Sequence, residues 1–563
     1  MKLWLSLSLL LFVQLPAVNI ADELVAKVSR QIHSFSGDEL QSSADIVHRL
    51  IDTGYLSELH WPDISAYRSE LINFYASSNY SLAWIRDNQP TVQAREMISL
   101  LESAGKKGLR AEDYDAVYWQ RRIAILSLPV AKVREGFDVA LTVSTMRYLY
   151  DLHNGRLPPP PFRSATEGDK SSLDLAEFLR TRIVNGEDIA KTVEEVEPPF
   201  TGYRRTKSAL EHYLSLEREG EGDPLPAITE PLNPGDAYAG VAQLIARLQR
   251  LGDFSGNPEA LPVSNIYEGT VVEAVRHFQQ RHGLFPDGRI DKDTFEELVA
   301  PLHHRVVQLE LALERWRWLP ADLKPPLIVV NIPEFHLRAY DEHKLSLSTR
   351  VITGKAFGHQ TPVFADELEY VIFRPYWNVP NSILQQELIP KLEEDRAYLT
   401  KYHFEVVKKG AVITDGTVND AILERLRAGE LGIRQTPGPS NALGLIKFVF
   451  PNSYDVYLHA TPEQELFERS RRDFSHGCIR VEDPVALATW LLRDDPSWTK
   501  ERIIAAMNGS ETMRVNLPHK IPVLIVYGTA FVEENGEARF YRDIYRHDAA
   551  LEHALEVQYP YPH

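Results

Sequence analysis

The chain has 563 residues, a length that corresponds to about three or four domains of roughly 150 residues each. Hydrophobic residues make up 44% and charged residues 25%, proportions that are typical of a globular protein and exclude disorder throughout the chain. The formal net charge of −18 argues against a protein that coats phosphate backbones, which needs a basic surface, so we expect no nucleic-acid partner.

The first residues have the pattern of an export signal. Lys2 gives a basic start, residues 3–18 carry no charge, and the small residues Ala17 and Ala21 follow. This order predicts a secretory signal peptide at residues 1–21, cleaved after Ala21. An uncleaved membrane anchor is the alternative. We expect no membrane attachment other than such an anchor. Either version places the body of the protein outside the cytoplasm.

Residues 22–220 are predicted to form a mainly helical domain. Apolar residues recur at helical spacing, as in the segment 94–101, and strand-like alternation is scarce. Four consecutive prolines at 158–161 interrupt the helices, since proline cannot continue a helix. Residues 221–236 are rich in glycine, proline and acidic side chains, and we predict a linker there.

Residues 237–300 are predicted to form a compact unit of three helices. Their sequence resembles the small peptidoglycan-binding domain. The resemblance implies binding to peptidoglycan glycan, and a packing module that binds nothing is the alternative. The residues that carry it are Leu248-Gln249, Ala274-Val275, Phe278-Gln279, His282-Gly283-Leu284 and Asp287-Gly288.

The period of the apolar residues changes after a predicted connecting helix at 301–324. Alternation predicts a mostly β domain at 325–510, interrupted by a charged, helix-prone insertion at 381–432. In residues 511–563 we predict a hairpin that completes the sheet, with its turn at Asn535-Gly536, followed by a tail. The whole chain is therefore predicted to be a multidomain α+β protein. The predicted strands are 327–332, 335–340, 347–353, 369–373, 446–450 and 454–459, and the predicted hairpin arms are 523–532 and 538–544.

The residue types needed for nucleophilic catalysis gather late in the chain. Cys478 is the only cysteine, so it cannot form an internal disulfide. A thiolate nucleophile needs a nearby base or cation that lowers its pKa. His459, at the end of a predicted strand, is the candidate base, and Arg480 adds positive charge. Gly477 allows backbone N–H groups to turn towards a substrate carbonyl, as an oxyanion hole requires.

Each of these assignments has an alternative. Cys478 could be a buried, unreactive thiol, and His459 could be a strand-end histidine bonded to the backbone. His476 could act as the base in place of His459. Ser475 fits a residue that shapes the loop better than it fits a second nucleophile, and Arg480 could hold structure or bind a substrate carboxylate.

The run Ser475-His476-Gly477-Cys478-Ile479-Arg480, with His459 nineteen residues before Cys478, resembles the L,D-transpeptidase catalytic domain. With the helical first half and the peptidoglycan-binding unit, the whole chain resembles the large periplasmic L,D-transpeptidases of Gram-negative bacteria. Other matching segments follow in the same order as in that family: Gly354-Lys355, Thr361-Pro362, Tyr376-Trp377-Asn378-Val379-Pro380 and Asn441-Ala442-Leu443-Gly444.

The resemblance implies a reaction in the periplasm on peptidoglycan tetrapeptide stems, which serve as donor and acceptor. The Cys478 thiolate would attack the amide between diaminopimelate and the terminal D-alanine. The side-chain amine of a second stem would then resolve the thioester and give a 3–3 cross-link. His459 would be the general base and acid, with His476 supporting it and the Gly477 backbone in the oxyanion hole. The substrate-binding residues implied are Arg480, Tyr376, Trp377, Asn378 and Ser475.

Several further expectations follow from the same resemblance. Carbapenems should acylate the thiol, other cell-wall synthesis enzymes are the protein partners to expect, and no metal or cofactor is needed. The insertion 381–432 should act as a mobile lid, with a fixed surface decoration as the alternative. Hydrolysis of the same acyl-enzyme, as in a carboxypeptidase, and a non-catalytic wall-binding protein stay open as other functions.

Overall fold

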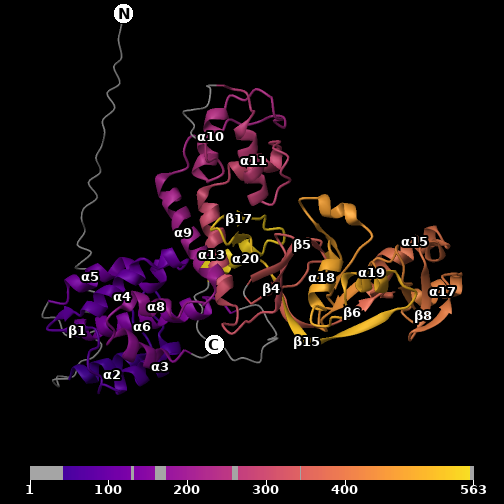
Figure 1. The fold of residues 1–563 in the computed structure, drawn as a ribbon. Helices are drawn as coiled ribbons and strands as arrows, with labels where there is room; N and C mark the ends of the chain where they lie inside the picture. The colour runs from indigo at the N-terminus through magenta and orange to yellow at the C-terminus, as the bar shows by residue number, and fades with distance from the viewer. Residues whose placement is uncertain (1–41, 128–131, 159–172, 257–263, 343, 558–563) are drawn as a thin grey trace, which may run out of the picture.

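The computed structural model describes residues 42–127, 132–158, 173–256, 264–342 and 344–557 (Figure 1). The predicted signal peptide at residues 1–21 lies outside these ranges. Within them, no helix is both long and apolar enough to cross a membrane. A helical N-terminal region, a three-helix unit and a mostly β region follow one another along the chain, so the predicted multidomain α+β class is confirmed.

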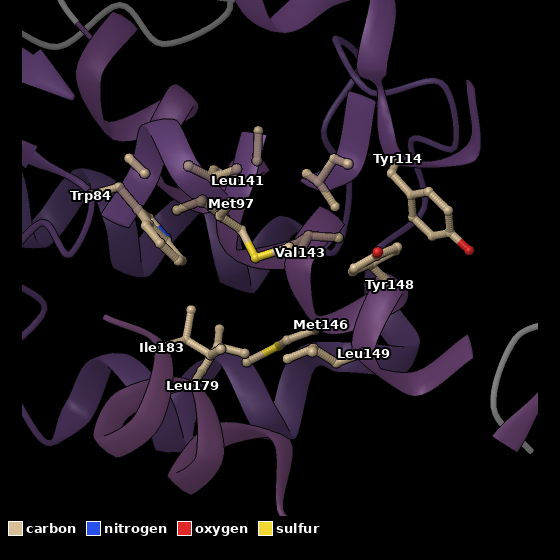
Figure 2. Packing of buried hydrophobic residues seen from close by; sticks show 14 of the residues in the cluster. Trp84, Met97, Tyr114, Leu141, Val143, Met146, Tyr148, Leu149, Leu179 and Ile183 are labelled. Atoms are coloured by element: carbon tan, nitrogen blue, oxygen red, sulfur yellow. The ribbon is translucent and has the colours of Figure 1, made fainter. Parts of the chain in front are cut away.

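The N-terminal region is organised around one long helix, α6 (Val133–Asn154), which is buried along most of its length. Apolar side chains occur all around α6 rather than along one stripe, so other elements must cover every side. Figure 2 shows Leu141 and Met146 of α6 packed among side chains that include Trp84 and Ile183. The other elements are α2 (Ser43–Thr53), α3 (Arg68–Ala76), β1 (Ile85–Arg86), β2 (Gln89–Pro90), α4 (Val92–Glu102), α5 (Trp119–Ala124), α7 (Leu175–Phe178), α8 (Ile189–Glu194) and α9 (Thr201–Glu219).

The three-helix unit has a hydrophobic core of its own, to which the predicted linker contributes. Leu232, from the predicted linker at 221–236, is buried in this core and exchanges two backbone hydrogen bonds of 2.9 Å with Ile290. The end of the predicted linker is therefore packed against the unit. The helices are α10 (Val241–Arg250), α11 (Thr270–Arg281) and α12 (Lys292–Leu298).

Helix α13 (Leu302–Arg317) joins the helical and β parts of the molecule. It lies alongside α9, and Leu309 and Leu313 of α13 share one apolar cluster with Tyr203 and Leu210 of α9 (Figure 1). The chain reaches the first strand of the large sheet soon after α13 ends. This packing fixes the N-terminal region to the start of the β domain.

Nine strands of the described residues form one large sheet, in the order β13-β5-β14-β12-β11-β6-β15-β3-β4. The long strand β5 pairs with β4 through its first half and with β14 and β13 through its second half, so the sheet closes on itself. Helices α18 (Pro484–Leu491) and α19 (Lys500–Asn508) contribute to its core. The strands are β3 (Leu327–Asn331), β4 (His336–Asp341), β5 (Lys344–Gly354), β6 (Phe364–Phe373), β11 (Ile446–Val449), β12 (Leu458–His459), β13 (Asp473–Ser475), β14 (Ile479–Val481) and β15 (Met513–Val526).

The predicted strand at 454–459 is much shorter in the structure. Only Leu458 and His459 form strand β12, because the preceding residues make a turn around Asn452. The Asn452 side-chain oxygen accepts hydrogen bonds from the backbone N–H groups of Tyr454 (3.0 Å) and Val456 (3.2 Å). Asparagine side chains commonly replace ladder partners in this way and so end a strand.

The predicted C-terminal hairpin forms across its predicted turn, but it does not complete the large sheet. Strand β15 completes the large sheet between β6 and β3, whereas β16 (Ala530–Val532) and β17 (Ala538–Phe540) form a separate two-stranded sheet. The break falls at Gly528, whose N–H donates to the Asn331 side chain at 2.8 Å instead of to a neighbouring strand. The small hairpin packs on α9 and α13, and helix α20 (His547–Val557) follows.

The insertion at 381–432 is not simply helical, as predicted, but contains a sheet. Its strands pair with β7 (Trp377–Asn378) in the order β7-β10-β8-β9. A separate hydrophobic cluster, which includes Leu388, Leu392 and Val406, fills it. The apolar alternation at 404–407 is the signal that the prediction missed. Its elements are α14 (Asn381–Ile383), α15 (Ile389–Glu394), α16 (Tyr398–Lys401), β8 (Phe404–Lys408), β9 (Ala411–Thr414), α17 (Asp420–Arg427) and β10 (Gly432–Gln435).

Candidate active site

Two adjacent parallel strands place the candidate nucleophile and base. In the ladder between β12 and β14, Leu458 is opposite Ile479 and His459 is opposite Arg480. Leu458 and Ile479 are buried in the core, so alternation turns His459 and Arg480 to the other face of the sheet. Cys478 immediately precedes β14, and this register sets it beside Tyr457, the residue before β12.

His459 is a buried, neutral imidazole. Its Nδ1 lies 2.6 Å from the carbonyl oxygen of Ala460, an acceptor that requires a proton on that nitrogen. Nε2 is then the nitrogen that can take up a further proton. Burial, together with the positive charges of Arg480 and Lys447, lowers the pKa of His459 to about 3, while the backbone hydrogen bonds with Ala460 and Leu443 act to raise it. The imidazole is therefore unprotonated at rest, and it takes up a proton only when a negative charge forms beside it.

Cys478 rests as a thiol rather than a thiolate. The partly buried Sγ donates to the carbonyl oxygen of Asp455 at 3.6 Å. Burial raises the pKa of Cys478, and the charge of Asp455 raises it further. Hydrogen bonds from the backbone and the side chain of Tyr457 act in the opposite direction, as does the charge of Lys447.

The loop before Cys478 is held by its own side chains. Ser475 Oγ donates to the Cys478 carbonyl at 2.5 Å and accepts the Gly477 N–H at 3.1 Å. Gly477 has φ 114°, a value that L side chains rarely adopt. Because the Gly477 N–H is engaged with Ser475, the next backbone donor that could face a substrate oxygen is the N–H of Cys478 itself. Ser475 thus contacts the loop in the manner expected of a shaping residue.

The segment Gly354-Lys355…Thr361 supports this loop from the neighbouring strand. The Thr361 hydroxyl donates to the Gly477 carbonyl at 2.8 Å and accepts the N–H of Gly354 at 2.8 Å. The N–H of Lys355 donates to the Ser475 carbonyl at 2.9 Å. A Cβ at Gly354 would lie 1.9 Å from a backbone oxygen of His359, so only glycine fits there. These contacts explain why Gly354, Lys355 and Thr361 occur together at this spacing.

His476 faces the insertion. Its Nε2 forms a hydrogen bond with Glu387, and its ring makes an edge contact with that of His359, with 4.7 Å between ring centroids. Burial lowers the pKa of His476, while Glu387 acts to raise it. His476 therefore connects the Cys478 loop to the insertion, which fits a supporting role better than that of the base.

The predicted substrate-binding residues Tyr376, Trp377 and Asn378 form a wall beside the insertion. Trp377 and Asn378 form β7, which pairs with β10 of the insertion rather than with the large sheet. Tyr376 is 40% exposed, and the Arg434 guanidinium lies 4.3 Å from its ring centroid. The hydrogen bond from the Trp377 side chain to Tyr457 lowers the pKa of that phenol, which burial and Cys478 raise. This wall thus reaches the nucleophile through Tyr457.

Arg480 lies opposite His459 in the ladder between β14 and β12. It forms an ion pair with Glu463, and its charge lowers the pKa of His459. The cation whose charge lowers the pKa of Cys478 is Lys447.

Residues 325–504 match the family described as "L,D-transpeptidase catalytic domain". The β region of this chain is an L,D-transpeptidase catalytic domain. Residues 69–210 match the family described as "Scaffold domain", and residues 238–298 match "Putative peptidoglycan binding domain". The order of the three agrees with the resemblance found in the sequence.

A relative from Haemophilus influenzae, named "Putative L,D-transpeptidase", is 34% identical over 225 residues. The match covers 40% of this chain and 45% of the relative, so it spans less than half of the relative's length. Two crystal structures of L,D-transpeptidases also match part of this chain, with low TM-scores. An L,D-transpeptidase from Xylanimonas cellulosilytica (residues 123-326) has 15% identity and a TM-score of 0.18, and covers 54% of this chain and 100% of that chain. One from Stackebrandtia nassauensis has 13% identity and a TM-score of 0.22, and covers 54% of this chain and 97% of that chain.

Two polar residues of the L,D-transpeptidase domain were missed in the sequence. Lys447 lies between the buried Ile446 and Phe448, so alternation alone turns it to the face that carries His459. Tyr457 precedes the short strand β12. A lysine inside an apolar strand was a usable signal, but only the pairing of β11 with β12 shows which residue it faces. Among the described residues of the chain, no group of three or more His, Cys, Asp and Glu side chains is arranged to hold a metal ion.

Proposed function

We propose that this chain is a cysteine-dependent L,D-transpeptidase that forms 3–3 cross-links between peptidoglycan stems. The observation that carries the proposal is the position of the chain's only thiol. Cys478 stands at the start of β14, next to the strand that ends in His459, inside the matched catalytic domain. The predicted signal peptide and the peptidoglycan-binding unit support a site of action in the periplasm.

The first half of the proposed reaction transfers a stem to Cys478. As Sγ attacks the carbonyl carbon between diaminopimelate and D-alanine, the thiol proton passes to Nε2 of His459. The thiolate that forms stabilises the imidazolium, which offsets the low pKa of the resting imidazole. The Cys478 N–H can donate to the developing oxyanion. The C–N bond then breaks, D-alanine leaves with the proton from His459, and a thioester remains.

The second half regenerates the enzyme. The side-chain amine of diaminopimelate on another stem attacks the thioester carbonyl and loses a proton to His459. The C–S bond breaks, the thiolate takes up that proton again, and the new amide is the 3–3 cross-link. Water in place of the amine would give a shortened stem, so the choice of acceptor separates transpeptidation from hydrolysis.

A carbapenem should add its mass to Cys478, because the same thiol would open the strained lactam amide. His459→Ala should slow this acylation by about a hundredfold, since a positioned base contributes about that much. Intact-mass spectrometry over time measures the rate in both proteins. An unchanged rate in the His459 variant would remove His459 from the role of base, and an adduct on another residue would remove Cys478 from that of nucleophile.

We further propose that the insertion opens and closes over the site. It contacts the Cys478 loop through the Glu387–His476 pair and borders Tyr457 through β7. An element that reaches the site through His476 and the two-residue strand β7 is suited to substrate-gated closure. Hydrogen exchange should therefore slow in residues 385–430 when the carbapenem adduct forms. Equal protection of this segment in the free and acylated enzyme would contradict the lid and favour a fixed decoration.

A further inference from the structure

A lysine lies beside the candidate nucleophile without a carboxylate of its own. In the antiparallel ladder between β11 and β12, Lys447 is the direct partner of His459. Its Nζ lies 3.5 Å from the centroid of the Tyr457 ring. Among the described residues, no ion pair joins Lys447 to an Asp or Glu side chain. The negative charges that act on its ammonium are those of Asp455 and of an ionised Cys478.

The ammonium of Lys447 lies over the ring of Tyr457, and the backbone and hydroxyl of Tyr457 contact the sulfur of Cys478. A cation over an aromatic ring is attracted by the negative face of the ring. The Tyr457 backbone and side chain both form hydrogen bonds that lower the pKa of Cys478. A cation on the ring makes the phenol a stronger hydrogen-bond donor, so the effect of Lys447 on the sulfur has two routes, directly through space and through Tyr457.

The thiolate is the anion that fits this arrangement. Burial lowers the pKa of Lys447, and the charges of Cys478 and Asp455 raise it again. In the same way, the charge of Lys447 lowers the pKa of Cys478, which burial raises. The two groups therefore stabilise each other only when both are charged, which is the state that the attacking enzyme needs.

We propose that Lys447 is a positioning residue of this site, whose ammonium, held on the ring of Tyr457, stabilises the ionised form of Cys478. The inference about catalysis rests on the proposed function, whereas the effect on thiol ionisation does not. On this proposal, Lys447 is a cation that favours the thiolate, the effect that the sequence led us to expect of Arg480.

The other charges around the sulfur do not replace Lys447. Asp455 is negative and disfavours the thiolate. Arg480 is paired with Glu463 and acts on the imidazole of His459. His459 itself is neutral at rest. The other ionisable groups near the loop, Lys355, His359 and Glu387, surround the ring of His476.

Alkylation by iodoacetamide tests the proposal in the full chain, because Cys478 is its only thiol. The rate of mass addition, measured against pH, gives the apparent pKa of the thiol without any turnover. Lys447→Met should raise this apparent pKa by about one unit and slow alkylation near neutral pH about tenfold. Lys447→Arg keeps the charge and should stay close to the parent protein. Arg480→Met, the matched control, should shift the apparent pKa by less than half as much.

Three results would overturn the proposal: an unchanged profile in Lys447→Met, an equal shift in Lys447→Met and Lys447→Arg, or a larger shift in Arg480→Met. Near-ultraviolet circular dichroism on each variant shows whether the site is still folded, and Lys447→Gln replaces Lys447→Met if it is not. A parent protein that makes no cross-links, together with the expected alkylation shift in Lys447→Met, would count against the proposed function and not against Lys447, so the two failures can be told apart.

Discussion

Cys478→Ala should abolish the formation of cross-linked dimers from tetrapeptide muropeptides while the protein stays folded. The proposed covalent intermediate is a thioester on the sulfur of Cys478, so the rate should fall by at least about a thousandfold. In the folded protein, the thiol forms hydrogen bonds with the Asp455 carbonyl and with Tyr457, and hydrogen bonds of sulfur are weak, so their loss should cost about 1–2 kcal/mol of stability. Mass spectrometry of the products and thermal unfolding measure the two effects.

Ser475→Ala is the matched control for this variant. It removes a neighbouring side chain of similar size, which holds the Cys478 and Gly477 backbone but is not proposed to attack. Dimer formation should slow and yet remain measurable, because the thiol is intact. Dimers made by Cys478→Ala at a rate similar to that of the parent would place the nucleophile elsewhere.

Glu314→Ala should be the most destabilising single change at the junction between the helical region and α13. The carboxylate is almost fully buried and accepts the backbone N–H groups of Arg156 (2.6 Å) and Leu157 (3.0 Å). It also pairs with the buried guanidinium of Arg317 at 3.2 Å. Its removal leaves a buried positive charge and two donors without this acceptor, which should cost about 3–5 kcal/mol.

Urea unfolding followed by tryptophan fluorescence measures this loss, because Trp316 and Trp318 flank the junction. Glu296→Ala provides the control with the same chemical change. That carboxylate is 55% exposed and lies 3.8 Å from Lys292, so its loss should cost about 1 kcal/mol or less. Similar losses in the two variants would contradict the buried network described for Glu314.

The motif chemistry could be predicted from the sequence, because it lies in short segments. The Ser475–Arg480 run and His459 are close along the chain, and parallel pairing of β12 with β14 brings them side by side. The roles of Arg480 and Lys447 could not be assigned in the same way. They depend on which residues face each other across β11, β12 and β14, and register between distant strands is set by the packed sheet.

The errors in the fold have the same origin. The turn Asn535-Gly536 is a strong local signal for the C-terminal hairpin, but it does not indicate which sheet the hairpin joins. Which sheet the hairpin joins is decided elsewhere, by Gly528 and Asn331 and by packing on α9. In the insertion, the charged residues concealed the short apolar alternation of β8. Local patterns thus predicted the elements better than their partners.

The central claim is that Cys478 carries the peptide stem as a thioester. The most direct measurement is to mix the full-length protein with disaccharide-tetrapeptide, quench within seconds in acid, digest, and identify the Cys478 peptide by mass spectrometry. We predict a disaccharide-tripeptide on Cys478, free D-alanine, and later a 3–3-linked dimer. Dimer or D-alanine without any Cys478 adduct would contradict the thioester, and a tripeptide monomer as the only product would contradict transpeptidation in favour of hydrolysis.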